Sequence, residues 1–492
     1  MNGTLPSNSR CVTGTGSCIA TRNCAYRHST NSLRAIPTSH RYVPAVNQFP
    51  LTLHRLPIIT GMCGHYYSTV KRPRNTEQLQ RRGPDAWQET VIPGLGYFGS
   101  ARLTTRGKAT DQPVIRPEGV LQYNGATYNS LHQSDTEWIA NHIADTVDTV
   151  RSLDGEYALV WCTERSVTFC TDVFGMRPLY YYSTGKDLTV SSLPGPVHEL
   201  HSRYYRCEPN SIYTWDRASG TVTRQVNRQW DLSQTDRSYD TVWQMWEKSI
   251  IDRYTPDSSI AISSGYDSGM VACTANKFYS DIDCYNIYNE HEQNDVLRLR
   301  GDIHSITTID LKGEHGTPEL QSTLAQVLPD NEHIECNWFM NAGDTAIYRD
   351  HMLPKHKRIM LTGDGGDDIY SDYGFHGHRM RQHSRFGGHF PDVLANVWPW
   401  HENNVFQDFH NRSEAVGGHW GMEMRCPMMS VALVQAWLNT TAQLKNRKHK
   451  GWMAQYMKDH HYPFADIEKL GPGIKMGSYH PADKHRNITT NK

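Results

Sequence analysis

The stretch IAISSGYDSGMV, Ile260 to Val271, places a buried-type strand, a loop of small residues and a helix start in direct succession. We expect the strand over 259–263, a tight turn at Gly265, and a helix over 269–279 that begins after Asp267 and Ser268. Backbone N–H groups in such a loop and at a helix start form a cradle for anions, which suits phosphate or pyrophosphate. Connections of this kind also occur without a ligand, so the stretch alone leaves a phosphate site and a plain turn both open.

A second loop, TGDGGDD at Thr362 to Asp368, follows a strand expected over 358–362. Its three carboxylates lie within five residues and repel one another unless a cation or a reacting group uses them. A solvated turn would explain the glycines but not the density of acid. In an open α/β sheet both loops would lie at the carboxyl edge of the strands, where ligands bind.

Around these loops the second half of the chain alternates helical and strand-like patterns. Apolar residues at helical spacing predict a helix over 240–253. Further strands are expected over 284–288 and 305–311, and a further helix over 318–327. Strands that alternate with helices are typical of a parallel sheet covered by helices. We therefore predict a parallel α/β nucleotide-binding domain over 226–492, with the boundary between 215 and 240.

The first half is instead made of short β-rich runs between Asn-Gly, Asp-Gly and Pro-Gly turn signals. Strands are expected over 94–98, 121–128, 157–162, 167–171, 179–182 and 188–191, and one helix over 135–153. This pattern predicts an α+β domain over 62–225.

Composition narrows the class of protein. The 492 residues carry a formal net charge of −1, which removes the usual grounds for a nucleic-acid or membrane-surface partner. No run approaches the roughly 18 to 20 apolar residues of a membrane helix. The 11 cysteines form no CxxC pair, so a reducing, cytoplasmic setting is expected. His376, His378 and His383 have a spacing that could hold a metal, but a solvated basic loop is the favoured interpretation.

Residues 1–61 differ from the rest, because they contain no Asp, Glu or Lys but six Arg and many Ser, Thr, Asn and Pro. Three interpretations are open: an extension from a start codon placed too early, a cleaved pro-segment, or an Arg-rich targeting peptide. In each of them the fold is expected to begin near Met62, and 1–61 to lie outside it.

Several motifs carry a family resemblance. SSGYDS at 263 resembles the SGGxDS loop, or PP-loop, of ATP pyrophosphatases, and TGDGGDD followed by Tyr373 resembles the SGEGxDE…Y segment of glutamine-dependent asparagine synthetases. In the first half the matching segments follow the family's order: MCG at 62, RRGPD at 81, ARLTT at 101, DQPV at 111, YNGATYN at 123, SDTE at 134, LDGEYAL at 153 and DVFGMRPLYYY at 172. Beyond about 375 only EMRCP at 423 and a Lys-rich helix near 448–450 continue it. The resemblance implies an Ntn-type αββα sandwich followed by a parallel α/β PP-loop domain.

For the first half the resemblance implies a class II glutamine amidotransferase, whose nucleophile is an amino-terminal cysteine that uses its own α-amine as general base. Cys63 would then be residue one of the mature enzyme, although a buried free thiol is the ordinary alternative. Asn124 and the N–H of Gly125 would form the oxyanion hole, Arg102 would bind the glutamine carboxylate, and Asp135 its ammonium. The remaining implied glutamine-binding residues are Leu103, Thr104, Thr105, Arg106 and Ala126.

For the second half the resemblance implies ATP and Mg²⁺ as cofactors, with Asp267 and Asp367 as metal ligands. The implied ATP-binding residues are Ile262, Ser263, Ser264, Gly265, Asp267, Ser268, Ile287, Thr362, Gly363 and Lys450, with Lys448 as the weaker alternative to Lys450. Asp364 takes the place of a family glutamate that assists the reaction intermediate. The implied reaction converts aspartate to β-aspartyl-AMP, which ammonia from glutamine then turns into asparagine.

Departures from the family pattern affect the acceptor more than the donor. Ser264 replaces the first loop glycine, so this position must avoid a left-handed backbone or a close approach of phosphate. Asp364 is one methylene shorter than glutamate. An enzyme that amidates or cyclises another carboxylate, and a non-catalytic nucleotide-binding relative, therefore remain alternatives. The expected partners are glutamine, aspartate and ATP, with no nucleic acid or membrane, and with a homodimer allowed.

Overall fold

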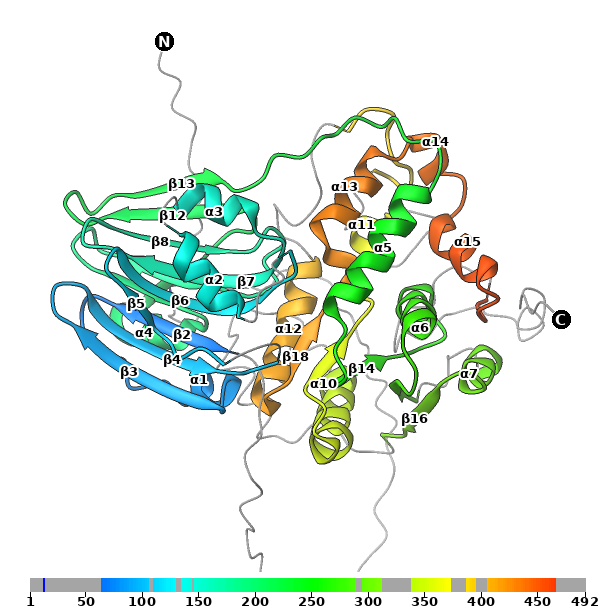
Figure 1. The fold of residues 1–492 in the computed structure, drawn as a ribbon, viewed down its shortest axis with the longest axis horizontal. Helices are drawn as coiled ribbons and strands as arrows, with labels where there is room; N and C mark the ends of the chain where they lie inside the picture. The colour runs from blue at the N-terminus through cyan, green and yellow to red at the C-terminus, as the bar shows by residue number, and fades with distance from the viewer. Residues whose placement is uncertain are drawn as a thin grey trace, which may run out of the picture.

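A computed structural model describes residues 12–13, 63–105, 109–129, 134–143, 146–288, 294–311, 338–372, 386–394 and 405–465. The first half contains two antiparallel sheets that lie face to face (Figure 1). The first has the strand order β1-β11-β9-β10-β2-β4-β3 and the second β13-β12-β8-β7-β6-β5. Their bounds are β1 Val12–Thr13, β2 Gly64–Ser68, β3 Ala86–Ile92, β4 Gly96–Arg102, β5 Val114–Arg116, β6 Gly119–Thr127, β7 Gly155–Cys162, β8 Ser166–Thr171, β9 Tyr180–Ser183, β10 Leu188–Ser191, β11 Arg203–Arg206, β12 Ser211–Asp216 and β13 Val222–Val226.

Alternation along the strands separates three apolar layers. Tyr67, Phe98 and Val160 lie in a cluster between the two sheets. Leu121, the neighbour of inward-facing Val120, faces the helices on the outside of the second sheet, α2 (Asp135–His142) and α3 (Thr146–Ser152). Helices α1 (Glu77–Arg82) and α4 (Pro194–His201) cover the outer face of the first sheet. Leu79 of α1 lies in the apolar cluster between these helices and the sheet. The expected αββα sandwich is confirmed by these layers.

The single helix expected over 135–153 is wrong, because two helices occupy this range. The hydroxyl of Thr149 donates to the carbonyl oxygen of His142 at 2.6 Å, and the hydroxyl of Thr146 donates to that of Ile143 at 3.3 Å. These side chains take carbonyls that a continuous helix would bond to backbone N–H groups, so the helix ends and restarts here.

The second half contains one parallel sheet in the order β16-β15-β14-β17-β18, which confirms the predicted parallel α/β domain. Its strands are β14 Ser258–Ala261, β15 Asp283–Ile287, β16 Ser305–Ile309, β17 Ile359–Leu361 and β18 Glu423–Arg425. The described helices are α5 Asp240–Arg253, α6 Tyr266–Phe278, α7 Asn294–Gly301, α10 Trp338–Ala346, α11 Gly366–Ile369, α12 Val405–Trp420, α13 Val431–Asn439, α14 Ala442–Lys445 and α15 Gly451–Asp459. The helix expected over 318–327 lies outside the described residues.

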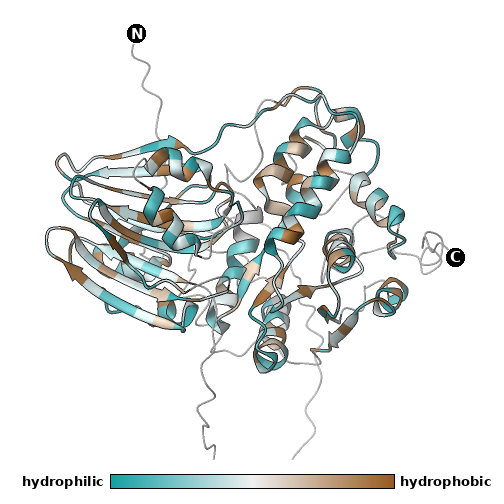
Figure 2. Cartoon of the chain, in the orientation of Figure 1, coloured by the Kyte–Doolittle hydropathy of each residue, from teal (hydrophilic) through white to brown (hydrophobic). Residues whose placement is uncertain are grey.

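Helix α5 shows why the sequence pattern works in this half. Val242, Trp246 and Ile250 follow one another at four-residue spacing and are all buried, whereas the rest of the helix is more polar, as its mixed colouring in Figure 2 shows. Trp246 packs against Trp452 of α15, which closes the core on this side of the sheet.

The strand order places the direction reversal of the parallel sheet between β14 and β17. The chain moves outward from β14 to β15 and β16, then returns to β17 on the other side of β14. Ligands bind at such a switch point, outside the carboxyl ends of the strands. The loops over 262–268 and 362–368 follow these two strands and therefore lie side by side.

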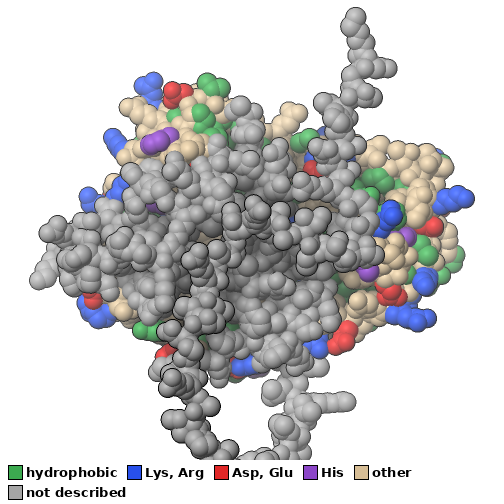
Figure 3. Space-filling model, turned by 180° about the vertical axis from the view of Figure 1, so that it is seen from behind, with side chains coloured by type: hydrophobic (Ala, Val, Ile, Leu, Met, Phe, Trp, Pro, Cys, Tyr) green, Lys and Arg blue, Asp and Glu red, His purple; other side chains and the backbone are tan. Residues whose placement is uncertain are grey.

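Helix α12 and strand β18 lie against the first half of the chain (Figure 1). Arg82 of α1 forms a buried ion pair with Glu414 of α12. Val12 and Thr13, within the segment expected to lie outside the fold, pair with Tyr204 and Arg203 of β11. Seen from behind, the described parts of the surface show Lys and Arg side chains mixed with Asp and Glu (Figure 3). In the described residues no helix combines the length and the apolar character that crossing a membrane would require.

Candidate active sites in the two halves

Cys63 directly precedes β2 and contacts Leu103, the residue that follows β4. The Leu103 N–H donates to Cys63 Sγ at 3.2 Å, and the Leu103 carbonyl oxygen lies 3.5 Å from the same sulfur. Arg82 Nε donates to the Cys63 carbonyl oxygen at 3.4 Å. The predicted nucleophile is thus fixed by a residue of the predicted glutamine-binding loop and by a helix that also contacts the second half.

Asn124 faces the first sheet from β6. Gln122, two residues earlier on the same face, donates through Nε2 to the carbonyl oxygens of Tyr66 and Gly99 at 3.0 and 2.9 Å, which ties the two sheets together near Cys63. Asn124 is only 1% exposed, and in the described part of the chain its Nδ2 has no hydrogen-bond partner. A buried donor left unpaired in the protein is what an oxyanion hole offers to a developing negative charge.

Gly125 has a positive φ of 139°. A Cβ atom at this position would lie 2.0 Å from the carbonyl oxygen of Glu156 on β7. The YNGATYN motif therefore requires glycine here, because no side chain fits between the paired strands β6 and β7. Ala126, the next predicted glutamine-binding residue, is buried.

The two predicted ligands of the glutamine amino-acid group come from different elements, the end of β4 and the start of α2. Arg102, at the end of β4, forms an ion pair with the exposed carboxylate of Asp111. Asp135, the first residue of α2, accepts the Thr127 N–H at 3.3 Å and the Thr136 N–H at 2.7 Å. Both carboxylate oxygens of Asp135 therefore face backbone donors. The negative charge of Asp135 also contributes to the raised pKa of the Cys63 thiol.

The remaining predicted glutamine-binding residues continue the loop after β4. The Thr104 N–H donates to Asp85 Oδ2 at 2.8 Å, and the Thr105 hydroxyl donates to Glu423 Oε2 of β18 at 2.7 Å. The loop therefore touches the second half directly. Arg106 lies outside the described residues.

Burial dominates the electrostatics around Cys63. It raises the pKa of the thiol to about 12, the N–H of Leu103 opposes the rise, and the carboxylates of Glu423 and Asp135 add to it. Burial, aided by the positive charge of Arg82, also lowers the pKa of neighbouring His65 to about 3. The Cys63 thiol therefore stays protonated in the chain that continues upstream of it, and His65 is neutral.

In the second half the loop after β14 is closed by its own side chains. The Ser263 and Ser268 hydroxyls lie 2.8 Å apart, and the Gly265 N–H donates to Ser263 Oγ at 3.2 Å. Ser264 has no positive φ, in agreement with the constraint expected for a glycine replacement. Arg300 of α7, which sequence reasoning missed, donates to the carbonyl oxygens of Ser263 and Gly265 and so holds the backbone of the loop.

The acidic loop after β17 packs onto the same helix start. A Cβ at Gly363 would lie 2.7 Å from the backbone carbon of Asp267, and one at Gly366 would lie 2.2 Å from Asp267 Oδ1. Thr362 anchors the loop, because its N–H donates to the carbonyl oxygen of Arg425 on β18 at 3.0 Å. The glycines of TGDGGDD thus let two loops distant in sequence interlock.

The two predicted metal ligands both contact the ammonium of Lys450. Lys450 Nζ lies 2.5 Å from Asp267 Oδ2 and 2.5 Å from Asp367 Oδ1, and the lysine is 3% exposed. Its ammonium marks a position between two carboxylates that a hard cation could also take. The donor set therefore fits Mg²⁺. Lys448, the alternative considered, is exposed.

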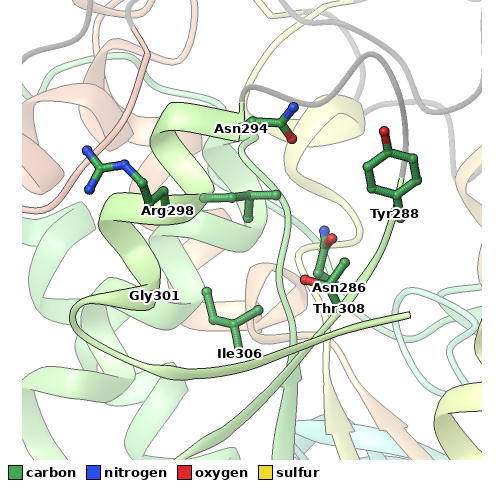
Figure 4. Close-up of a pocket in the computed structure, with 8 residues that line it drawn as sticks. Asn286, Tyr288, Asn294, Arg298, Gly301, Ile306 and Thr308 are labelled. Carbon is green, nitrogen blue, oxygen red and sulfur yellow. The ribbon is translucent and has the colours of Figure 1, made fainter. Parts of the chain in front are cut away.

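Ile262 directly follows β14, and Ile287 is the last residue of the neighbouring strand β15. The Ile262 N–H donates to the Tyr285 carbonyl oxygen at 2.8 Å, and Asn286 Nδ2 donates to the Ile262 carbonyl oxygen at 3.0 Å. A cavity of about 310 Å³ opens next to them, between α7 and the strands β15 and β16 (Figure 4). Its lining residues are Asn286, Tyr288, Asn294, Leu297, Arg298, Gly301, Ile306 and Thr308.

A buried charge cluster joins the two halves between these sites. Arg177 is 1% exposed, and its guanidinium lies 2.6 Å from Glu414 Oε2, 3.4 Å from Glu156 Oε2 and 3.6 Å from Glu423 Oε1. Glu156 also accepts from Arg253 Nε at 2.9 Å. The cluster links β7 of the first half with α5, α12 and β18 of the second.

Sequence reasoning missed most of this cluster. Arg177 belongs to the DVFGMRP motif and Glu423 to EMRCP, so the motif order could have flagged both. Glu414, in contrast, lies outside the motifs that carry the family resemblance. Its role is visible only because α12 lies between the two halves.

Two family models match the chain. The model of the glutamine amidotransferase domain matches residues 59–215, and the model of asparagine synthase matches residues 256–416. Together they cover well over half of the chain, and each model falls on one of the two sheet systems.

Similar proteins include two curated relatives of low identity. A Methanocaldococcus jannaschii protein named putative asparagine synthetase (glutamine-hydrolyzing) 1 is 20% identical over 400 residues, which span 73% of this chain and 71% of the relative. An asparagine synthetase domain-containing protein of Saccharomyces cerevisiae is 22% identical over 433 residues, spanning 73% of this chain and 79% of the relative.

Among solved structures, a glutamine phosphoribosylpyrophosphate amidotransferase from B. subtilis in complex with ADP and GMP matches with a TM-score of 0.29 at 16% identity, covering 46% of this chain and 61% of its own. An allosteric regulatory enzyme of purine biosynthesis matches with a TM-score of 0.28 at 12% identity, covering 50% of this chain and 80% of its own.

The fold, the two loop systems and the family models define an ATP-dependent amidotransferase that uses glutamine as nitrogen donor. The chain belongs to the asparagine synthase family, in the form that carries an amino-terminal glutamine amidotransferase domain.

Proposed function

We propose that this chain is a glutamine-hydrolysing asparagine synthetase. In this proposal ATP activates the aspartate side-chain carboxylate as β-aspartyl-AMP with release of pyrophosphate, and ammonia from glutamine displaces AMP to give asparagine. The observation that carries the proposal is that the glutamine site and the ATP site are connected by contacts across the interface between the two halves. Thr105 of the glutamine loop and Arg177 of the first half both contact Glu423, two residues before the Arg425 that holds Thr362.

The proposed domains are a glutaminase domain over 62–225 and a synthetase domain over 226–492, with 1–61 removed or not translated. Loss of this segment together with Met62 would give Cys63 a free α-amine, which is the general base that a class II amidotransferase needs. The raised pKa of the Cys63 thiol in the longer chain supports this requirement. A base within the same residue lets the thiol lose its proton while it attacks the glutamine amide carbon.

In the glutaminase half, Asn124 Nδ2 and the Gly125 N–H are proposed to receive the negative charge of the tetrahedral adduct. The unpaired amide of Asn124 supports this role, because it costs no rearrangement when charge develops. Arg102 is proposed to exchange its surface partner Asp111 for the glutamine carboxylate, and Asp135 to bind the substrate ammonium.

In the synthetase half, the 263–268 loop and the Thr362 and Gly363 backbone are proposed to hold the ATP phosphates. Ile262 and Ile287 are proposed to border the adenosine. Asp267 and Asp367 are the proposed Mg²⁺ ligands, and Mg²⁺ supplies charge neutralisation on the pyrophosphate. Lys450 would then contact phosphate oxygens, and Asp364, which is 39% exposed, would act on the intermediate.

Two alternatives keep the architecture. The Ser264 and Asp364 replacements would be compatible with a different carboxylate acceptor, and a nucleotide-binding relative without catalysis would keep the loops alone. The described cysteines are free, in line with the proposed cytoplasmic setting, and a homodimer is an allowed assembly.

The exchange of labelled pyrophosphate into ATP separates these possibilities, because it reports acyl-adenylate formation without ammonia. We expect exchange that depends on aspartate. Exchange stimulated by another carboxylate but not by aspartate would transfer the proposal to that acceptor, and no exchange with any carboxylate would leave only the non-catalytic alternative.

A further inference from the structure

Three side chains with metal-binding atoms converge beside the nucleotide loop. Asp364 lies in the acidic loop, His410 on α12 and Cys426 directly after β18. One carboxylate oxygen, one imidazole nitrogen and the Cys426 sulfur lie within 4.8 Å of one another. The elements that supply these side chains are separated in the sequence, so no local motif predicts the cluster.

The hydrogen bonds of His410 define which nitrogen faces the cluster. Nε2 lies 3.1 Å from the Met176 carbonyl oxygen, which can only accept, so Nε2 carries the proton in the neutral ring. Nδ1 then keeps its lone pair, and it lies 3.5 Å from Cys426 Sγ and 4.0 Å from Asp364 Oδ2. A metal-bound histidine is oriented in this way, with its other ring nitrogen donating to a backbone carbonyl.

The distance between the sulfur and the imidazole nitrogen matches that of two zinc ligands. Tetrahedral zinc with a Zn–S distance of about 2.3 Å and a Zn–N distance of about 2.0 Å separates sulfur and nitrogen by about 3.5 Å, as Cys426 and His410 are here. In the same geometry nitrogen and oxygen should be about 3.3 Å apart, whereas His410 Nδ1 and Asp364 Oδ2 are 4.0 Å apart, so the partly exposed Asp364 side chain must move closer to bind the ion.

Burial raises the pKa of the Cys426 thiol, so the sulfur keeps its proton until a cation replaces it. Thr362 Oγ1 lies 3.3 Å from Cys426 Sγ and can donate its hydroxyl hydrogen to it. His410 and Cys426 are buried, whereas Asp364 is accessible and offers an entry side. Sulfur and imidazole donors select zinc over Mg²⁺ or Ca²⁺, which prefer oxygen ligands.

We propose that Asp364, His410 and Cys426 form a zinc site that ties the acidic loop to α12 and β18. Zinc binds the Cys426 sulfur as the thiol proton leaves to solvent, and the His410 Nδ1 lone pair and an Asp364 oxygen complete three protein ligands. The site is distinct from the Asp267 and Asp367 pair but shares Asp364 with the proposed synthetase site, so Asp364 cannot bind zinc and act on the intermediate at the same time.

The test uses the full chain, stripped with a chelator and titrated with Co²⁺ as a spectroscopic probe for zinc. We expect one equivalent to give a thiolate-to-cobalt charge-transfer band that zinc displaces. The band should disappear in Cys426→Ser, and zinc affinity should fall by more than about 100-fold, because even outer-shell partners of a metal site are worth about 10- to 100-fold.

Matched variants separate this site from the other thiols and histidines. Cys284→Ser, a buried cysteine on β15, and Cys63→Ala should keep the band. Asp364→Asn, at a partly exposed position that should not disturb folding, should shift the band and weaken binding. Absence of a cysteine-dependent band in the parent chain, or its persistence in folded Cys426→Ser, would overturn the proposal.

Discussion

Lys450 places its ammonium 2.5 Å from Asp267 Oδ2, and the same nitrogen lies 2.5 Å from Asp367 Oδ1. The lysine holds two carboxylates together at the switch point of the sheet. It has a positive φ of 49°, and the backbone N–H groups of Met453 and Ala454 bond to its carbonyl oxygen. The position is therefore fixed from both the backbone and the side chain.

Lys450→Met should destabilise the protein when divalent cations are absent. Removing one partner of a buried ion pair costs about 3–5 kcal/mol, because the remaining charges lose their partner. Added Mg²⁺ should restore more of the thermal stability in the variant than in the parent, as it replaces the missing cation. Thermal unfolding with chelator and with Mg²⁺ measures this difference. Lys448→Met, at an exposed neighbour, is the control, and equal unfolding temperatures for parent and Lys450→Met in chelator would contradict the account.

Asn124→Leu should lower the glutaminase kcat by about 10²–10³-fold, the range for loss of an oxyanion-hole donor. Leucine has a similar branched shape and removes an unpaired buried N–H, so the free energy of unfolding should stay the same or rise. Gln122→Leu, on the same face of β6, breaks bonds to Tyr66 and Gly99 and should lose stability instead, by about 1–3 kcal/mol. If both variants lost stability alike, the distinction drawn between the two amides would be wrong.

The pH dependence of Cys63 alkylation reports its environment. In the chain with residues 1–62 attached, the raised pKa of about 12 means that the thiolate fraction increases about tenfold per pH unit from pH 7 to 10, with no plateau. After processing, the free α-amine, with a pKa of about 8, can take the thiol proton. The alkylation rate should then reach its plateau near pH 8. Peptide mapping by mass spectrometry assigns the modified cysteine. A plateau near pH 8.5 in the longer chain would contradict the raised pKa of the Cys63 thiol.

Arg177→Met should lower the free energy of unfolding by about 3–5 kcal/mol, because Glu414 and Glu156 lose a buried cation. The variant should also hydrolyse more glutamine per product formed, since the cluster joins the two halves. Arg224→Met is the matched control, as its pair with Glu208 is 44% and 51% exposed and should contribute less than about 1 kcal/mol. Denaturant unfolding and the ratio of glutamate to product measure the two effects, and an unchanged ratio would argue against coupling through this cluster.

Local patterns predicted the elements well where packing follows one face. Helix α5 begins and ends as predicted, because Val242, Trp246 and Ile250 bury one stripe. The parallel sheet followed from alternation, and its switch point brought the 262–268 and 362–368 loops together. The helix over 135–153 failed because hydroxyl groups of Thr146 and Thr149 compete for backbone carbonyls, which apolar periodicity does not register.

Contacts between segments that are distant in the sequence could not be predicted, for a different reason. Arg300 reaches the Ser263 carbonyl from α7, and Glu414 reaches Arg177 from α12, yet neither lies in a motif or on a periodic apolar face. The predicted site residues came from motif order, which names residues without showing how they meet. The contact of Lys450 with both Asp267 and Asp367, and the absence of a hydrogen-bond partner for Asn124 Nδ2 among the described residues, become visible only in the folded structure.

The most direct measurement follows nitrogen through both halves in one reaction. The protein with Cys63 at its amino terminus, confirmed by intact mass, is incubated with ATP, Mg²⁺, aspartate and glutamine labelled with ¹⁵N in the amide. We predict ¹⁵N-labelled asparagine with one AMP and one pyrophosphate per product. Cys63→Ala should make none from glutamine but retain synthesis from free ammonia. Glutamine hydrolysis and ATP cleavage without label in asparagine would contradict the proposed function.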